Sequence, residues 1–190
     1  MSFASRVCGA LLTCGLPLFA ASAPGIKNFD QVDAHVYRGA QPAADGFQYL
    51  AKIGVKTVID LRQTGHRSQD EERAVTAAGM QYVSVPMSGL TPPTYAQISK
   101  ILGMLEDQAS GPVFVHCRRG ADRTGAVIAA YHIDHDNWNN DHALQDAKAH
   151  GMSRFQLPRQ SYIRNFQPHA QNAVLVSPAS AAPVKTAGAN

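Results

Sequence analysis

Cysteine is scarce in this chain. Three of its 190 residues are cysteine, and two of them, Cys8 and Cys14, lie in the apolar N-terminal stretch. The remainder of the chain carries Cys117 alone, which has no second cysteine for an internal disulfide. A small scaffold held together by disulfides is therefore excluded. Cys117 is either a buried bystander or a reactive thiol.

Strong charge and long apolar runs are also missing. The net charge is +3 and 16% of the residues are charged, so the composition gives no reason to expect a nucleic acid partner. The apolar run of residues 7–20 is interrupted by Gly9, Gly15 and Pro17. It is shorter than the roughly 20 residues that span a bilayer. We therefore expect no stable membrane span in the mature protein.

The N-terminal stretch has the features of a secretory signal peptide. Arg6 supplies a positive start, residues 7–20 form the apolar segment, and small residues at 20–23 close it. We predict that residues 1–23 are a signal peptide and that the protein is exported, either periplasmic or secreted. An uncleaved anchor is the alternative. Mass spectrometry decides between them, because a mature chain that still begins at Met1 contradicts cleavage.

The rest of the chain is predicted to form one domain, residues 26–169, followed by a tail. Residues 170–190 are rich in Ala, Ser and Pro and lack apolar periodicity, which predicts disorder. Strands are predicted at 36–38, 55–61, 81–85 and 112–115. Helices are predicted at 43–53, at 68–78 with a Ser68 cap, after a Thr91 cap, and at 124–134, 139–150 and 160–166. This alternation predicts an α/β fold with a mostly parallel central sheet and helices on both faces.

One strand-to-helix junction collects the chemically active residues in the pattern Cys-x5-Arg, from Cys117 to Arg123. A loop of this length can curl around a phosphate with its backbone N–H groups pointing inward. The following helix adds the positive end of its dipole. Gly120 suits a turn at positive φ, and the planar fork of Arg123 can hold two phosphate oxygens. The same positive groups favour the thiolate of Cys117.

The roles predicted for this junction follow from that arrangement. The residues expected to bind phosphate are Arg118, Arg119, Gly120, Ala121, Asp122 and Arg123. Thr124 is expected to donate its hydroxyl to the sulfur, His116 to support the loop from behind, and Gly125 to let the helix approach the loop closely.

The junction resembles the signature of the cysteine-based protein tyrosine and dual-specificity phosphatases. The matching residues are His116, Cys117, Gly120, Arg123, Thr124 and Gly125. Segments 36–42 and 54–62, together with Tyr131 and Trp138, resemble exported bacterial members, so the likeness covers most of residues 35–166. The resemblance implies hydrolysis of phosphomonoesters through a phosphocysteine at Cys117, without metal or cofactor. Its substrate would be a phosphorylated protein or a small phosphorylated anion.

The chain departs from this family pattern in one place. These phosphatases usually carry an aspartate, on a separate loop, that protonates the leaving oxygen, but residues 87–95 contain no Asp or Glu. Asp122, inside the phosphate loop, is the candidate replacement as general acid. The alternative is a structural Asp122 that bonds to loop amides or pairs with Arg38 or Arg62. Arg62 also follows a strand end and could face the pocket.

Three further questions stay open at this point. Arg118 and Arg119 are either solvated, or they select a multiply charged substrate such as an inositol phosphate or a phosphoinositide. The absence of an acid from residues 87–95 supports a second hypothesis, a pseudophosphatase that binds phosphate without hydrolysing it. His132, His135 and His142 lie close together in the sequence but lack the tight spacing of zinc ligands, so we predict no metal site.

Overall fold

The structure is a computed structural model that describes residues 23–168. The predicted tail and the predicted signal peptide, Ala23 apart, lie outside the described residues. Ala23 and Ile26 are buried and pack into the core, so the fold includes residues ahead of the predicted boundary at 26. None of the helices in residues 23–168 combines the length and the apolar character that crossing a membrane requires.

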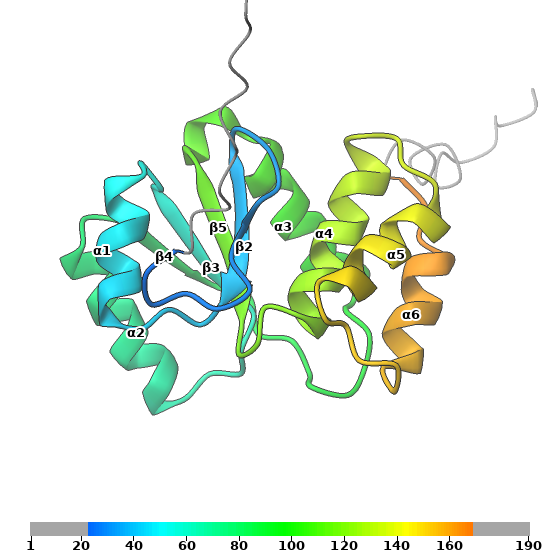
Figure 1. Cartoon of the computed structure of the whole chain (residues 1–190), viewed down its shortest axis with the longest axis horizontal. Helices are drawn as coiled ribbons and strands as arrows, with labels where there is room; N and C mark the ends of the chain where they lie inside the picture. The colour runs from blue at the N-terminus through cyan, green and yellow to red at the C-terminus, as the bar shows by residue number, and fades with distance from the viewer. Residues whose placement is uncertain (1–22, 169–190) are drawn as a thin grey trace, which may run out of the picture.

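The centre of the fold is a five-stranded sheet in the order β1-β2-β5-β3-β4 (Figure 1). The strands are β1 Asp30–Gln31, β2 Val36–Ala40, β3 Thr57–Asp60, β4 Gln81–Ser84 and β5 Val113–Cys117. Strands β2, β5, β3 and β4 run parallel, and β1 joins β2 antiparallel. The predicted mostly parallel sheet is confirmed. The two-residue β1 was not predicted because it is too short to show a periodic pattern.

Within residues 23–168, six α-helices cover the two faces of this sheet. They are α1 Ala44–Lys52, α2 His66–Ala77, α3 Tyr95–Glu106, α4 Asp122–Asp134, α5 Asn140–Ala149 and α6 Leu157–Arg164, with a short 3-10 helix at Gln108–Ser110. Helices α1 and α2 lie on one side of the sheet, and α3 to α6 lie on the other (Figure 1). The predicted cover of helices on both faces is therefore confirmed.

Strand β5 shows why the molecule has one core on each face. All five of its residues are buried, as expected for a central strand of a parallel sheet. Val113 and Val115 pack into the larger cluster with α3 to α6, while Phe114 points into the smaller cluster with α1 and α2. This alternation follows from the two-residue period of a strand. It also places Cys117, the last residue of β5, on the same face as Val113 and Val115, at the carboxyl end of the central strand.

Four predicted helix starts are wrong. Helix α4 begins at Asp122 rather than at 124, α6 begins at Leu157 rather than at 160, and the other two are α2 and α3. Helix α2 begins at His66, and Ser68 stands at its third position, where its hydroxyl accepts from the Gly65 N–H at 2.9 Å. Helix α3 begins after Thr94 rather than Thr91. Thr94 Oγ1 accepts from the Gln97 N–H at 3.2 Å, and the Gln97 side chain accepts from the Thr94 N–H at 2.8 Å. This reciprocal capping box explains the later start of α3.

Candidate active site

The Cys-x5-Arg segment forms a tight loop between β5 and α4, at the carboxyl edge of the parallel strands. Gly120 has φ +67°, and a Cβ there would lie 2.4 Å from the carbonyl carbon of Gly39. Glycine is therefore required both for the turn and for the close approach of β2. The loop delivers the chain into α4, whose N-cap is Ala121. The predicted need for positive φ at Gly120 is confirmed.

The back of the loop is held by two side chains. Asn28 Nδ2 donates to the Gly120 carbonyl at 2.9 Å and to the His150 carbonyl at 3.0 Å. Arg38, which is 1% exposed, donates to the same Gly120 oxygen at 3.4 Å and pairs with Asp146 at 3.2 Å. In a planar trans peptide the C=O and the N–H point in opposite directions. Holding this carbonyl outward therefore turns the next N–H inward.

The Cys117 sulfur lies at the base of the loop and is 3% exposed. Burial alone would raise the pKa of this thiol. Hydrogen bonds from the Thr124 hydroxyl and from the backbone N–H groups of Thr124 and Arg119, with the charge of Arg123, outweigh burial and lower the pKa below its ordinary value. The side chain of Thr124 is fully buried, and its hydroxyl has no other hydrogen-bond partner among residues 23–168. Its donation to the sulfur stays a prediction.

Replacing Thr124 with valine tests that contribution. Valine keeps the shape but removes the hydroxyl, so the pKa of Cys117 should rise and the acid limb of kcat/KM should move to higher pH. A hydrogen bond to a charged group contributes about 1.5–3 kcal/mol, so activity at a pH on the acid limb should fall about 10-fold or more. The measurement is a pH profile with p-nitrophenyl phosphate. Thr124→Ser should keep the wild-type profile, and an unchanged limb in Thr124→Val would contradict the assignment.

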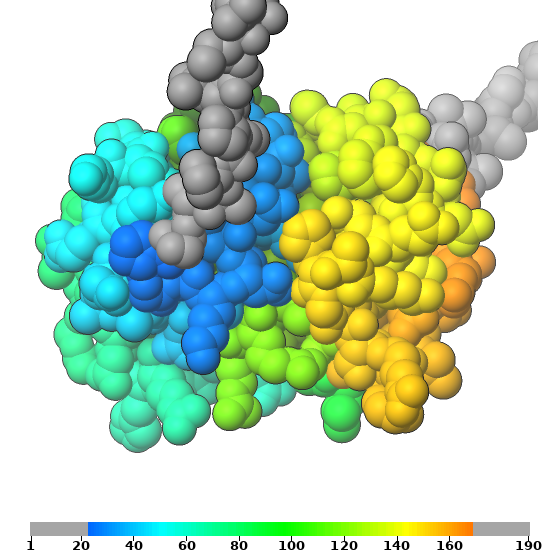
Figure 2. Space-filling model, in the orientation of Figure 1, coloured from blue at the N-terminus to red at the C-terminus, as the bar shows by residue number. Residues whose placement is uncertain are grey.

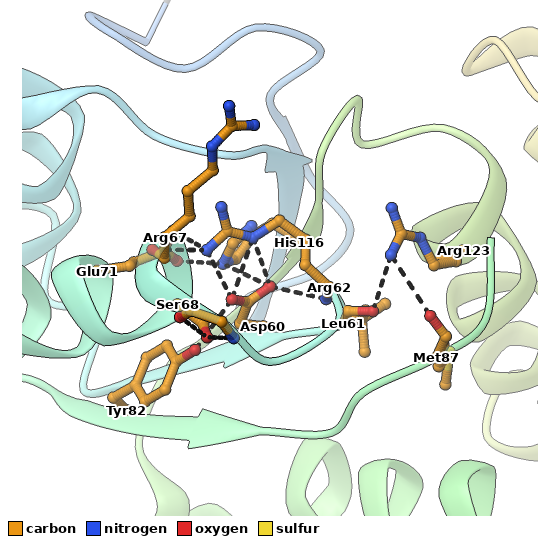
Figure 3. Close-up of polar contacts among 11 residues, drawn as sticks. Asp60, Leu61, Arg62, Arg67, Ser68, Glu71, Tyr82, Met87, His116 and Arg123 are labelled. Atoms are coloured by element: carbon orange, nitrogen blue, oxygen red, sulfur yellow. Dashed lines mark hydrogen bonds and ion pairs between the residues drawn. The ribbon is translucent and has the colours of Figure 1, made fainter.

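Arg123 projects from the first turn of α4 toward the ends of two other strands. Its Nη1 donates to the Leu61 carbonyl at 3.2 Å and, more weakly, to the Met87 carbonyl at 3.5 Å (Figure 3). Both bonds use Nη1, which leaves Nε and Nη2 for other acceptors. These two donors have the fork geometry that binds two oxygens of a phosphate.

Arg123 also lines a cavity of about 360 Å³ above the loop. The other lining residues are Gln41, Arg62, Gln63, Arg67, Gly89 and Arg118. Four arginines therefore surround one opening, and none of the described residues that line it is acidic. Arg62 is paired with the buried Asp60 and Glu71, so the excess positive charge comes from Arg67, Arg118 and Arg123. Such a concentration of positive charge in a concave site attracts an anion with several negative charges.

A buried charge network supports the loop from the sheet side (Figure 3). Arg62 donates to both oxygens of Asp60 at 2.7–3.1 Å and to Glu71 at 2.6 Å. His116 Nε2 lies 2.6 Å from Glu71, and the Tyr82 hydroxyl donates to Asp60 at 2.9 Å. Burial would raise the pKa of Asp60, but the bonds from Arg62 lower it. The network ties β3 and β5 to α2 directly behind the nucleophile, which fits the supporting role predicted for His116.

The same carboxylates leave little room for a metal ion. Asp60, Glu71 and His116 offer ligand atoms within 4.8 Å of one another among the described residues. The guanidinium of Arg62 already donates to both carboxylates, so a cation occupies the centre of the cluster.

The histidines that follow Tyr131 have a different arrangement. The rings of His132 and His142 stack on Trp138, each with its centroid 3.9 Å from the Trp138 ring. Asp136 lies 2.6 Å from His132 Nδ1 and 2.8 Å from His135 Nδ1. Ring stacking on Trp138 and the contacts with Asp136 account for the grouping of these histidines.

Asp122 has contacts on both of its carboxylate oxygens. Oδ1 accepts from the Ser153 backbone N–H at 2.8 Å, and Oδ2 pairs with Arg119. The predicted pairing with Arg38 or Arg62 is wrong, because Asp146 and the Asp60–Glu71 pair take those two arginines. The contacts that are present link the loop to the segment ahead of α6. They favour the structural interpretation of Asp122.

Gly125 has a different role from the predicted one. A Cβ at this position would lie 3.3 Å from the Ala147 Cβ and 3.2 Å from the Met152 terminal methyl. The glycine therefore allows α5 to pack against α4, and the loop is not the element that approaches it. The small Ala143 and Ala147 on α5 are fully buried at the same contact.

Sequence reasoning did not identify Asn28, Glu71 and Arg159. Arg159 is 1% exposed and donates to the Gly89 carbonyl at 3.0 Å and to the Ser88 carbonyl. It thereby fixes the segment after β4 that borders the cavity. The three residues lie far along the chain from Cys117, and no local spacing connects them to it.

The fold and the Cys-x5-Arg loop are those of the cysteine-based phosphatases of the dual-specificity type. A family model described as DSP-PTPase phosphatase fused to NAD+ kinase matches residues 20–165, and the chain belongs to that family.

Two curated relatives illustrate this membership. The dual specificity protein phosphatase TpbA of Pseudomonas aeruginosa is 27% identical over 137 residues, which are 72% of this chain and 60% of TpbA. The probable NAD kinase 2 of rice chloroplasts is 24% identical over 128 residues, 65% of this chain and 13% of the rice protein. The chain thus spans less than two thirds of the length of either relative.

Solved structures show the same fold. The catalytic core of the PP-IP phosphatase SIW14 from Saccharomyces cerevisiae has a TM-score of 0.68 at 22% identity, over 78% of this chain and 90% of that one. P. aeruginosa TpbA has a TM-score of 0.65 at 23% identity, over 82% and 99%. The predicted phosphatase fold is therefore confirmed.

Proposed function

We propose that the protein hydrolyses phosphomonoesters, phosphotyrosine in polypeptides above all, with tolerance for phosphoserine and phosphothreonine. The observation that carries this is the Cys117 thiol, whose pKa is lowered at the base of a loop that contributes Arg118 and Arg123 to an arginine-lined cavity. P. aeruginosa TpbA, carrying a serine in place of one of its cysteines, has been solved in complex with phosphotyrosine. That relative supports the choice of substrate.

The proposed reaction has two steps. The Cys117 thiolate attacks phosphorus, the P–O bond to the substrate breaks, and the leaving oxygen takes a proton from solvent water. Water then attacks the phosphocysteine and the S–P bond breaks. Inorganic phosphate is released and the thiolate is regenerated. The inward N–H groups and Arg123 stabilise the charge that develops on the phosphoryl oxygens in both steps. Thr124 stabilises the sulfur as it departs in the second step.

A second candidate substrate is an inositol phosphate or phosphoinositide. The specific observation in its favour is that Arg62, Arg67 and Arg118 line the cavity beside Arg123. Relatives include proteins called inositol diphosphatase, such as SIW14 of S. cerevisiae, 27% identical over 107 residues. Phosphate release from a phosphotyrosyl peptide, a phosphoseryl peptide and a soluble inositol polyphosphate should be compared at matched concentration. A higher kcat/KM for the inositol compound would overturn the first proposal.

The source of the leaving-group proton is tested by Asp122→Asn. Because both carboxylate oxygens are engaged, we expect a loss below about 10-fold that is the same for p-nitrophenyl phosphate and phenyl phosphate. A general acid contributes about 10²–10⁴ to the rate, mainly for poor leaving groups. A selective loss with phenyl phosphate would therefore restore Asp122 as the acid. Arg119→Ala is the matched control, since it removes one partner of Asp122 and keeps the carboxylate and its bond from the Ser153 N–H.

A further inference from the structure

Large apolar side chains are exposed next to the cavity. Among the described residues the exposed ones are Leu90 at 80%, Phe155 at 76%, Leu157 at 66% and Tyr95 at 55%. Scattered single exposed apolar residues need no explanation, but a group at one place marks an interaction site. Three of them, Leu90, Phe155 and Leu157, belong to two segments that touch each other.

The contact between these segments is direct. Gln156, which separates Phe155 from Leu157, donates to the Gly89 carbonyl at 3.4 Å. Leu90 follows Gly89, and Gly89 lines the arginine-rich cavity. The green segment after β4 and the gold segment ahead of α6 meet at the lower edge of the molecule (Figure 2). The three exposed apolar residues therefore belong to the two segments that meet beside the cavity, each next in the chain to Gly89 or to its partner Gln156.

Hydrogen bonds hold the backbone of the two segments that carry these side chains. The buried guanidinium of Arg159 donates to the Gly89 and Ser88 carbonyls and to Gln156. The Ser153 N–H donates to Asp122 at 2.8 Å, which ties the gold segment to the loop itself. A backbone that is already fixed loses little conformational entropy when a ligand covers the side chains that it carries.

We propose that Leu90, Phe155 and Leu157 form an apolar rim that binds an apolar side chain beside the phosphorylated residue of a polypeptide substrate. This inference rests on the proposed function. A phosphotyrosyl polypeptide matches both parts of the surface, because its phosphate meets the arginines of the cavity while its neighbouring residue covers the rim. A soluble inositol phosphate has no apolar part to place there.

The charges around the rim favour a polypeptide over a lipid surface. Surfaces that bind anionic membranes combine apolar residues with several exposed cations. Segments 88–92 and 153–158 contain one charged residue, Arg154. Its guanidinium lies over the Phe155 ring at 4.8 Å. The rim itself is therefore apolar and nearly uncharged, and the arginines beside it line the cavity that would take the phosphate. This separation fits a contact with an apolar side chain next to a phosphorylated residue.

The test uses a triple variant, Leu90→Ser with Phe155→Ser and Leu157→Ser. Two phosphotyrosyl peptides that differ only in having leucine or serine on both sides of the phosphotyrosine are compared with p-nitrophenyl phosphate. We expect the wild type to prefer the leucine peptide about 10-fold in kcat/KM, the low end of what one apolar group contributes to selection. The triple variant should lose that preference and keep its activity on p-nitrophenyl phosphate. Leu90→Met, Phe155→Leu and Leu157→Met together should retain the preference.

Every other outcome contradicts the proposal, and each one identifies which part of it is wrong. A preference that survives in the triple serine variant, or is absent from an active wild type, overturns the rim and leaves the proposed function intact. If the triple variant loses only turnover of phosphatidylinositol phosphate in vesicles, the rim binds lipid and the polypeptide assignment is wrong. A wild type inactive on every substrate removes the proposed function and the inference with it.

Discussion

Replacing Cys117 with serine is expected to lower kcat on p-nitrophenyl phosphate by about 10⁴-fold or more, the order seen when a catalytic nucleophile is removed. The serine hydroxyl has nearly the same shape but stays protonated, because the loop amides and Arg123 that lower the pKa of the thiol cannot ionise an alcohol to the same degree. The anion site is built from other atoms, so Cys117→Ser should still bind phosphate or vanadate. Calorimetry measures that binding, and a continuous assay measures the rate.

The two measurements together separate an enzyme from a phosphate-binding pseudophosphatase. An acid-quenched reaction of the wild type with radiolabelled substrate should leave label on Cys117 as phosphocysteine, and the serine variant should leave none at that position. If wild type and Cys117→Ser are equally inactive but both bind phosphate, the pseudophosphatase interpretation holds. If both are equally active, another group performs the attack and the proposed mechanism is wrong.

The phosphate loop could be predicted from the sequence because its determinants are local. Cys117, Gly120 and Arg123 lie within seven consecutive residues, between an apolar strand and an apolar helix, and each geometric requirement acts on its own residue. Gly120 supplies the positive φ and Arg123 supplies the fork, whatever the remainder of the chain does. The alternation of strand and helix likewise predicts the parallel sheet without any long-range contact.

The supports of the loop could not be predicted in this way. Arg38 meets Asp146 across 108 residues of sequence, and its burial is possible only because that carboxylate arrives from α5. The network of Arg62 with Glu71 likewise depends on α2 packing against the end of β3. A charged residue between apolar neighbours in a strand, as in Tyr37-Arg38-Gly39, is the signal that could have revealed buried pairing. The partner itself follows only from the tertiary fold.

Replacing Arg123 with alanine is expected to lower kcat/KM on p-nitrophenyl phosphate by about 10²–10³-fold, the size of the effect of removing one preorganised donor. Two losses combine in this variant. Nε and Nη2 no longer meet the phosphoryl oxygens, and the charge that helps to lower the pKa of Cys117 is gone. Arg123→Lys restores the charge without the planar fork. It should therefore recover the acid limb of the pH profile while kcat stays low.

The matched control for this prediction is Arg118→Ala. Arg118 lines the same cavity and carries the same unit of charge, but it belongs to the exposed part of the loop. With a singly phosphorylated aryl substrate its removal should change kcat/KM by less than about 10-fold, which is the range of a screened surface charge. Equal losses in Arg118→Ala and Arg123→Ala would mean that the summed field of the cavity drives catalysis. In that case the position of Arg123, held by the Leu61 and Met87 carbonyls, would have no special part in stabilising the transition state.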